Sequence, residues 1–200
     1  MSIYQLKPRF QALLRPLVRR LAAAGVTANQ VTVAACAVSV ALGLWLLLGD
    51  APRAAFALVP LWMLLRMGLN AIDGMLAREH GQQSKLGALL NELTDVLADA
   101  ALYAPFALVA PLQPAAVGAF IVLAGLTEFA GALGPTIGAE RRYDGPLGKS
   151  DRAFVFGALG LWVAASSALP GWLAWLMPLL VALAVWTLLN RVRRALQQAD

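Results

Sequence analysis

The sequence predicts an all-α protein that crosses a membrane with six helices and begins with one amphipathic helix. Of its 200 residues, 60% are hydrophobic and only 14% are charged, which is typical of integral membrane proteins. The chain offers about six apolar stretches near the roughly 20 residues that a helix needs to cross a bilayer. Apolar residues fill these stretches on every side, whereas a soluble helix would carry one apolar stripe.

Residues 1–26 are predicted to form an interfacial amphipathic helix, separate from a membrane domain over residues 27–200. Between residues 3 and 24, large apolar residues recur three and four positions apart and alternate with Lys and Arg. A helix of this kind lies along the membrane surface. Gly25 is expected to end it, and Thr27 or Asn29 to cap the helix that follows.

The six spans are expected at about 30–48, 54–78, 86–109, 115–137, 153–169 and 172–190. The connection between the second and third spans is predicted at Gly81 to Ser84, and residues 138–152 form the longest polar loop. The second span carries Arg66, which we expect to pair with an acidic group because an arginine at that depth rarely faces lipid. Glu128, in the fourth span, is a candidate for that partner.

The positive charges indicate how the chain is oriented. Of the 16 Lys and Arg residues, 14 lie in the N-terminal helix, the connection at 78–85, the loop at 141–152 or the C-terminal tail. Six spans would place these four regions on one side of the membrane, which the positive-inside rule makes the cytoplasmic side. Their position beside apolar spans favours contact with anionic lipids and argues against nucleic-acid binding.

Residues 70–95 interrupt the apolar pattern with polar side chains at helical spacing. Asn70 and Asp73 are three positions apart on one helix face, and Asn91 and Asp95 are four apart on another, with Gly87 one turn earlier. Two such faces brought together across a turn would form an oxygen-rich pocket suited to a hard cation such as Mg²⁺.

These residues resemble the signature of the CDP-alcohol phosphotransferase (CDP-alcohol phosphatidyltransferase) family, D-x2-D-G-x2-A-R-x8-G-x3-D-x3-D. The spacing is kept at all eight positions, and six residues are identical: Asp73, Gly74, Ala77, Arg78, Gly87 and Asp95. The two departures replace Asp by Asn, at Asn70 and Asn91. The segments LNAIDGMLARE and GPLGKSDRA look more closely like a bacterial inner-membrane branch of that family.

The resemblance implies transfer of a substituted phosphate from a CDP-linked lipid or alcohol, with CDP-diacylglycerol the expected donor, to an acceptor hydroxyl with release of CMP. It implies Mg²⁺ or Mn²⁺ held by Asn70, Asp73, Asn91 and Asp95, and Asp95 acting also as the catalytic base. Gly74, Ala77, Arg78 and Gly87 would bind the CDP moiety. The resemblance further suggests a homodimer in the bacterial inner membrane, with the site and both termini in the cytoplasm.

The two asparagines bear on the metal. An amide oxygen ligates a hard cation without supplying charge, so weaker binding, or one metal in place of two, is expected. Asp99, one turn beyond Asp95, is a candidate to compensate for the lost charge. Lys149 and Arg152, in the polar loop, are candidates for binding the acceptor, and contact with anionic lipid headgroups would explain them equally well.

Two other functions fit the same residues. The asparagines would suit a catalytically impaired, lipid-binding scaffold, and intramembrane acids also occur in transporters. A transporter is less favoured because we find no internal repeat and because the polar residues cluster on one side of the membrane.

Overall fold

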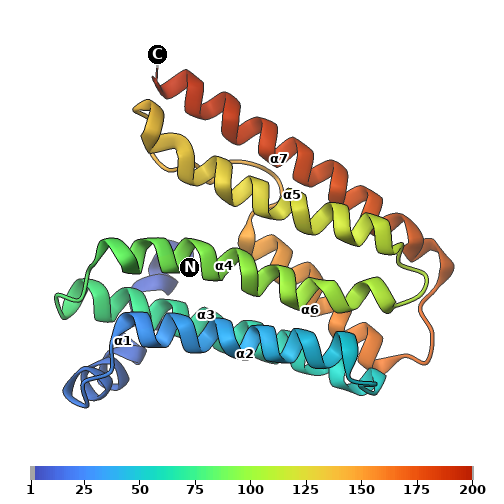
Figure 1. Ribbon diagram of the computed structural model, residues 1–200, viewed down its shortest axis with the longest axis horizontal. Coiled ribbons are helices and arrows are strands. Elements are labelled where there is room, and N and C mark those ends of the chain that lie inside the picture. Colours follow the sequence, from blue (N-terminus) through green and yellow to red (C-terminus); the bar gives the residue numbers. More distant parts are fainter. Residues whose placement is uncertain (1–2, 200) are drawn as a thin grey trace.

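The computed structural model describes residues 3–199 and contains only helices and connecting segments over that range (Figure 1). Residues 1–2 of the predicted interfacial segment and Asp200 of the membrane domain lie outside the described residues. The elements in chain order are α1 (Ile3–Ala23), α2 (Ala28–Leu48), η1 (Arg53–Ala57), α3 (Leu58–Glu79), α4 (Lys85–Tyr103), η2 (Ala104–Leu108), α5 (Pro114–Leu133), η3 (Gly134–Ile137), α6 (Lys149–Ala165), η4 (Gly171–Trp175) and α7 (Leu176–Ala199).

Four segments are long and apolar enough to cross a membrane: Ala28–Leu48, Arg53–Glu79, Pro114–Ile137 and Gly171–Ala199. The helices α4 and α6 lie among them, but α4 carries Lys85 and three acidic residues, and α6 has only 17 residues. Over residues 3–199 the protein is therefore all-α with four candidate spans, and the six-span arrangement stays a prediction.

The predicted ends of the helices agree with the structure except around α6 and α7. Thr27 caps α2, and its side chain accepts a hydrogen bond from the backbone N–H of Gln30. The connection between α3 and α4 falls between Glu79 and Lys85, as expected. Helix α6 begins at Lys149, earlier than predicted, because Asp151 caps its first turn through the backbone N–H of Gly148.

Helix α4 lies at the centre of the bundle, packed against α2 on one side and α5 on the other. Gly43 permits the close approach of α2 and α4, because a Cβ at this position would lie 2.1 Å from the carbonyl oxygen of Ala101. Helices α5 and α7 run side by side, and α6 packs against α3 (Figure 1).

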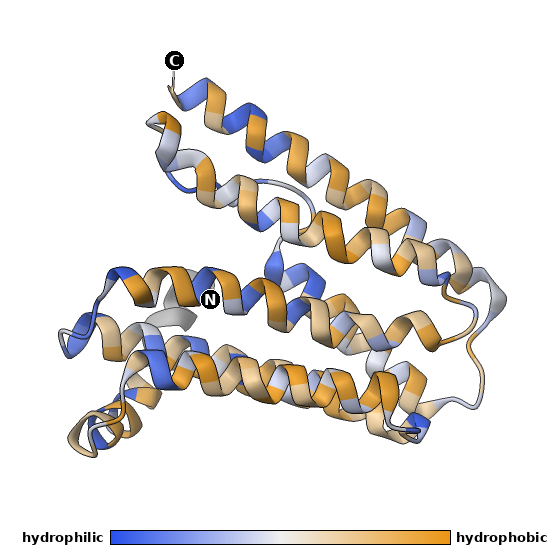
Figure 2. Cartoon of the chain, in the orientation of Figure 1, coloured by the Kyte–Doolittle hydropathy of each residue, from blue (hydrophilic) through white to orange (hydrophobic). Residues whose placement is uncertain are grey.

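The main core contains an aromatic cluster at the end of α4. Tyr103 stacks on Phe156 of α6 with ring centroids 4.0 Å apart, and Phe106 and Phe120 complete the cluster from η2 and α5. A second, smaller core joins α1 to α2 and α3 around the fully buried Val18. The polar residues lie mainly toward one end of the bundle, at the α3–α4 connection, the loop before α6 and the end of α7 (Figure 2).

Candidate active site

The polar faces of α3 and α4 meet, as the spacing of their residues predicts. The side-chain amide of Asn70 on α3 donates a hydrogen bond to Oδ1 of Asp95 on α4 at 3.3 Å. One turn further along α3, Asp73 is buried, and its Oδ2 accepts a hydrogen bond from Thr32 Oγ1 of α2 at 2.8 Å. Contacts between α2, α3 and α4 therefore hold Asn70, Asp73 and Asp95 in place.

Asp95 is held by positive charges on both of its carboxylate oxygens. Arg66 Nη2 of α3 donates to Oδ1 at 2.8 Å, and Lys149 Nζ lies 2.5 Å from Oδ2. Lys149 is the first residue of α6, so three helices converge on this carboxylate. The expectation that Arg66 pairs with an acidic group is met, but its partners are Asp95 and Asp99 instead of Glu128.

The remaining motif residues surround this centre. Asn91 is half-buried on α4, one turn before Asp95, and Ala77 is half-buried on α3. A Cβ at Gly74 would lie 2.9 Å from the guanidinium of Arg78, whose side chain is exposed. A Cβ at Gly87 would lie 2.8 Å from the side-chain oxygen of Asn29 on α2. Both glycines thus leave room for polar side chains over a bare backbone.

Asp99 forms ion pairs with two arginines. Arg66 Nη1 donates to its Oδ1 at 2.5 Å, and Arg152 Nη2 lies 3.8 Å from its Oδ2. The side chain of Asp99 is therefore already neutralised by charges on α3 and α6. That Asp99 compensates for the charge missing at the two asparagines stays a prediction. In the structure its carboxylate pairs with Arg66 and Arg152.

A buried cluster of charges continues from Asp99 into α5 and α7. Arg152 Nη2 donates to Glu128 Oε1 at 2.6 Å, and Arg191 Nη1 lies 3.4 Å from the same oxygen. Both arginine side chains are at most 2% exposed. Arg191 also donates to the carbonyl oxygen of Thr127. Buried charges of this kind are tolerated only when they are paired.

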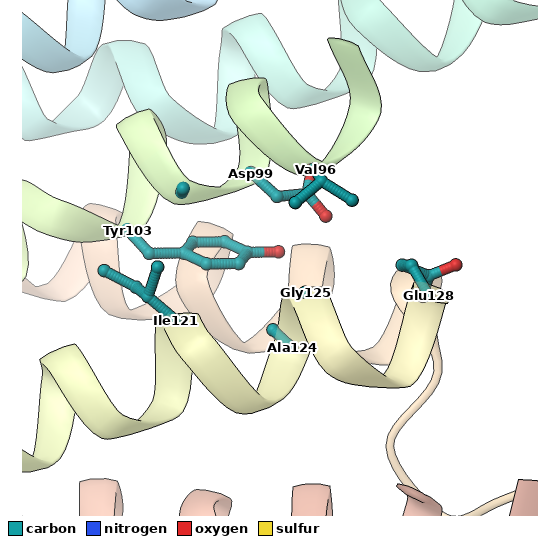
Figure 3. A pocket seen from close by; sticks show the side chains of 8 residues that line it. Val96, Asp99, Tyr103, Ile121, Ala124, Gly125 and Glu128 are labelled. Atoms are coloured by element: carbon teal, nitrogen blue, oxygen red, sulfur yellow. The ribbon is translucent and has the colours of Figure 1, made fainter. Parts of the chain in front are cut away.

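A small enclosed space lies between α4 and α5 within this cluster. Figure 3 shows the Tyr103 hydroxyl and the carboxylate of Asp99 directed toward it, with Glu128 on the α5 side. The space has a volume of about 10 Å³, which is about the size required by one water molecule.

A much larger cavity of about 520 Å³ opens between α3 and α6, beside Asp95. Most of its wall is apolar, with Met63, Met67 and Phe154 among the lining residues. Its polar lining includes Arg66, Asn70 and Lys149, all of which contact the Asp95 carboxylate. A molecule with an apolar chain and a polar group therefore matches its lining.

The donor chemistry suits one divalent cation, but not a carboxylate-rich pair of metals. Asp73 and Asp95 supply two negative charges, while Asn70 and Asn91 supply neutral amide oxygens. Within the described residues, no group of three His, Cys, Asp or Glu side chains is arranged to hold a metal. Asp95, moreover, already carries Arg66 and Lys149 on its two oxygens.

The sequence did not indicate three of these contacts: Lys149 with Asp95, Thr32 with Asp73, and the pairing of Glu128 with Arg152. Each joins residues of different helices. For Glu128 and Asp95 the sequence offered a signal, an acid inside an otherwise apolar span, which indicates that a partner exists without identifying it.

Comparison with known proteins bears on the function of this site. The CDP-alcohol phosphatidyltransferase family matches residues 25–186. The inner membrane protein YnbA of Escherichia coli K12 is 46% identical over 199 residues, covering 98% of this chain and 97% of YnbA.

Crystal structures of a Mycobacterium tuberculosis phosphatidylinositol phosphate synthase share the fold at 22% identity. The complex with CDP-DAG has a TM-score of 0.73 and covers 90% of this chain and 92% of its own. The complex with manganese and citrate has a TM-score of 0.71, with 90% and 87% covered. The family match over most of the chain decides the assignment: this protein belongs to the CDP-alcohol phosphatidyltransferase family, whose members are membrane transferases of phospholipid biosynthesis.

Proposed function

We propose that this enzyme transfers the phosphatidyl group of CDP-diacylglycerol to the hydroxyl of an acceptor alcohol and releases CMP. The observation that carries the donor assignment is the apolar cavity of about 520 Å³ between α3 and α6. Its polar lining lies beside Asp95, so a lipid could place its acyl region against the apolar wall and its diphosphate at the motif residues. The M. tuberculosis synthase structure that contains CDP-DAG supports this choice of donor.

Each motif residue has a proposed role. Asn70, Asp73, Asn91 and Asp95 would hold one Mg²⁺ or Mn²⁺, which when bound neutralises the diphosphate and stabilises charge on the departing CMP. Gly74 and Gly87, which lie under the side chains of Arg78 and Asn29, would line the CDP site beside Ala77, and the exposed Arg78 guanidinium would bind its phosphate oxygens.

Asp95 is proposed to act as the general base. The acceptor oxygen forms a bond to the phosphorus that carries the lipid, the bond from that phosphorus to the CMP oxygen breaks, and the hydroxyl proton passes to Asp95. Arg66 holds this carboxylate in place through its hydrogen bond to Oδ1.

For the acceptor we propose contact with Lys149 and not with Arg152. The Lys149 side chain is 34% exposed and lines the cavity, whereas the Arg152 side chain is 1% exposed and bound to Glu128. Arg152 would therefore act on the acceptor only through other residues.

We further propose a bacterial inner-membrane location, six spans with α4 and α6 included, and the site and both termini on the cytoplasmic side. The E. coli relative is named as an inner membrane protein. The start of α2, the α3–α4 connection and the end of α7 lie toward the same end of the bundle, on the left of Figure 1. A helix along the interface at residues 1–26, a membrane domain at 27–200 and a homodimer complete the proposal.

A CMP-release assay tests the proposed reaction. The purified protein in lipid vesicles is given CDP-diacylglycerol, a panel of acceptor alcohols, and Mg²⁺ or Mn²⁺. We expect release with at least one acceptor, and loss of release in Asp95→Ala. The matched control is Glu140→Ala, which removes an exposed acid from the loop before α6. Lack of release with every acceptor and both cations would contradict the proposal and favour a lipid-binding scaffold.

A further inference from the structure

We propose that Lys149 is an internal counter-ion of the site, competing with the divalent cation for Asp95. This inference rests on the proposed function because it concerns the same four motif residues. It means that Lys149 neutralises negative charge at the motif aspartates that a bound metal ion would otherwise neutralise.

The geometry places Lys149 where a cation would bind. Its Nζ lies 2.5 Å from Oδ2 of Asp95, the oxygen that Arg66 leaves free. Asn70 donates its amide to Oδ1, so that oxygen is occupied twice. A divalent ion therefore gains a full carboxylate ligand at Asp95 only when Lys149 leaves Oδ2.

The charge balance supports the same conclusion. Asn70 and Asn91 contribute no charge, so the acids of the site and its border are Asp73, Asp95 and Asp99. Arg66 and Lys149 oppose these three carboxylates and leave a single negative charge, since Arg152, which also faces Asp99, is balanced by its closer partner Glu128. A divalent cation added beside both positive side chains would make this group of residues net positive, which disfavours its binding.

Of the two positive side chains, only Lys149 is free to move. The side chain of Arg66 is 7% exposed and bound to two aspartates, so its removal would leave buried charge unpaired. Lys149 begins α6, its side chain is 34% exposed, and it lines the large cavity. Its ammonium group can therefore leave Asp95 and remain solvated.

The test is the affinity of the purified full-length protein for Mn²⁺ in detergent, measured from the electron paramagnetic resonance signal of free Mn²⁺. We expect Lys149→Gln to lower the Kd for Mn²⁺ about tenfold or more, because it removes a unit charge from the carboxylate that binds the ion. The matched control is Lys85→Gln, the same change at the exposed start of α4. It should leave the Kd unchanged.

A second variant shows where the ion binds. Adding Asp95→Asn to Lys149→Gln should abolish the gain in affinity, because the competition is for this carboxylate. An unchanged or higher Kd in Lys149→Gln, or a gain that survives the loss of the Asp95 charge, would overturn the inference.

The outcome is separable from that of the proposed function. CMP release by the wild-type enzyme together with an unchanged Kd in Lys149→Gln would reject the counter-ion and keep the transferase. Tighter Mn²⁺ binding in the variant of a protein that releases no CMP would keep the counter-ion and reject the proposed reaction.

Discussion

The buried carboxylate of Glu128 offers the strongest test of the charged cluster that supports the site. It accepts a hydrogen bond from Arg152 at 2.6 Å and lies 3.4 Å from Arg191, and both arginine side chains are at most 2% exposed. Glu128→Gln keeps the shape of the side chain and removes its charge. The remaining acid near these arginines is Asp99, 3.8 Å from Arg152 and already paired with Arg66.

The expected cost follows from the burial of the two arginines. Removing one partner of a buried ion pair destabilises proteins by about 3–5 kcal/mol, because the other charge stays buried without compensation. The side-chain amide carbonyl of the Glu128→Gln variant would still accept one hydrogen bond, so we expect a loss near the lower limit, about 3 kcal/mol. The measurement is the free energy of unfolding by SDS titration in mixed micelles.

Two further variants control this experiment. Glu140→Gln makes the same change at an exposed position and should alter the free energy of unfolding by less than about 0.5 kcal/mol. Arg191→Met combined with Glu128→Gln should cost less than the sum of the two single changes, since the double variant buries one fewer unpaired charge. A loss below about 1 kcal/mol in Glu128→Gln would refute the reasoning.

Two more predictions concern the rim of the site. Gly74→Ala places a Cβ 2.9 Å from the Arg78 guanidinium, so the KM for the CDP donor should rise severalfold while the unfolding midpoint does not fall. The control is Gly118→Ala, where nothing lies within 4 Å of the new Cβ. A rise in KM in this control would argue against the reasoning. In the loop before α6, hydrogen bonds from Arg142 hold the pKa of Asp144 below its usual 3.8. A carboxyl group whose pKa is lower in the folded state stabilises the protein above its unfolded pKa, and this stabilisation is lost as the pH falls through the folded pKa. Asp144→Asn should therefore lower the unfolding midpoint at pH 7, by an amount that shrinks as the pH falls below about 4. If Asp144→Asn lowered the unfolding midpoint equally at pH 7 and below about pH 4, the reasoning would be contradicted.

Much of the architecture could be predicted because it depends on local pattern. The apolar stretches, the Thr27 cap and the connection between Glu79 and Lys85 are encoded within a few residues of where they occur. The start of α6 was placed too late because Lys149 and Asp151 are charged, while the capping of the Gly148 N–H by Asp151 extends the helix through them. The number of membrane spans is the prediction that α4 and α6 leave open.

In the candidate site, too, the local pattern was predictable from the sequence and the contacts between helices were not. The spacing of Asn70, Asp73, Asn91 and Asp95 is a property of two helices and predicts one polar face on each. The structure adds that Asn70 reaches Asp95 across α3 and α4, and that Thr32 of α2 holds the buried Asp73. Hydrogen bonds between helices depend on their packing distance and rotation, which helical periodicity does not specify.

The sequence alone established the membrane class, the helical faces and the family signature with its two asparagines, because each follows from composition or from the fixed 3.6-residue turn. Only the tertiary structure decided which charges meet. It brought Arg66 and Lys149 to opposite oxygens of Asp95, and Arg152 to Glu128. A charge inside an apolar bundle requires a partner, but any of several acids would satisfy that requirement, and the packing of α3, α4, α5 and α6 selects among them.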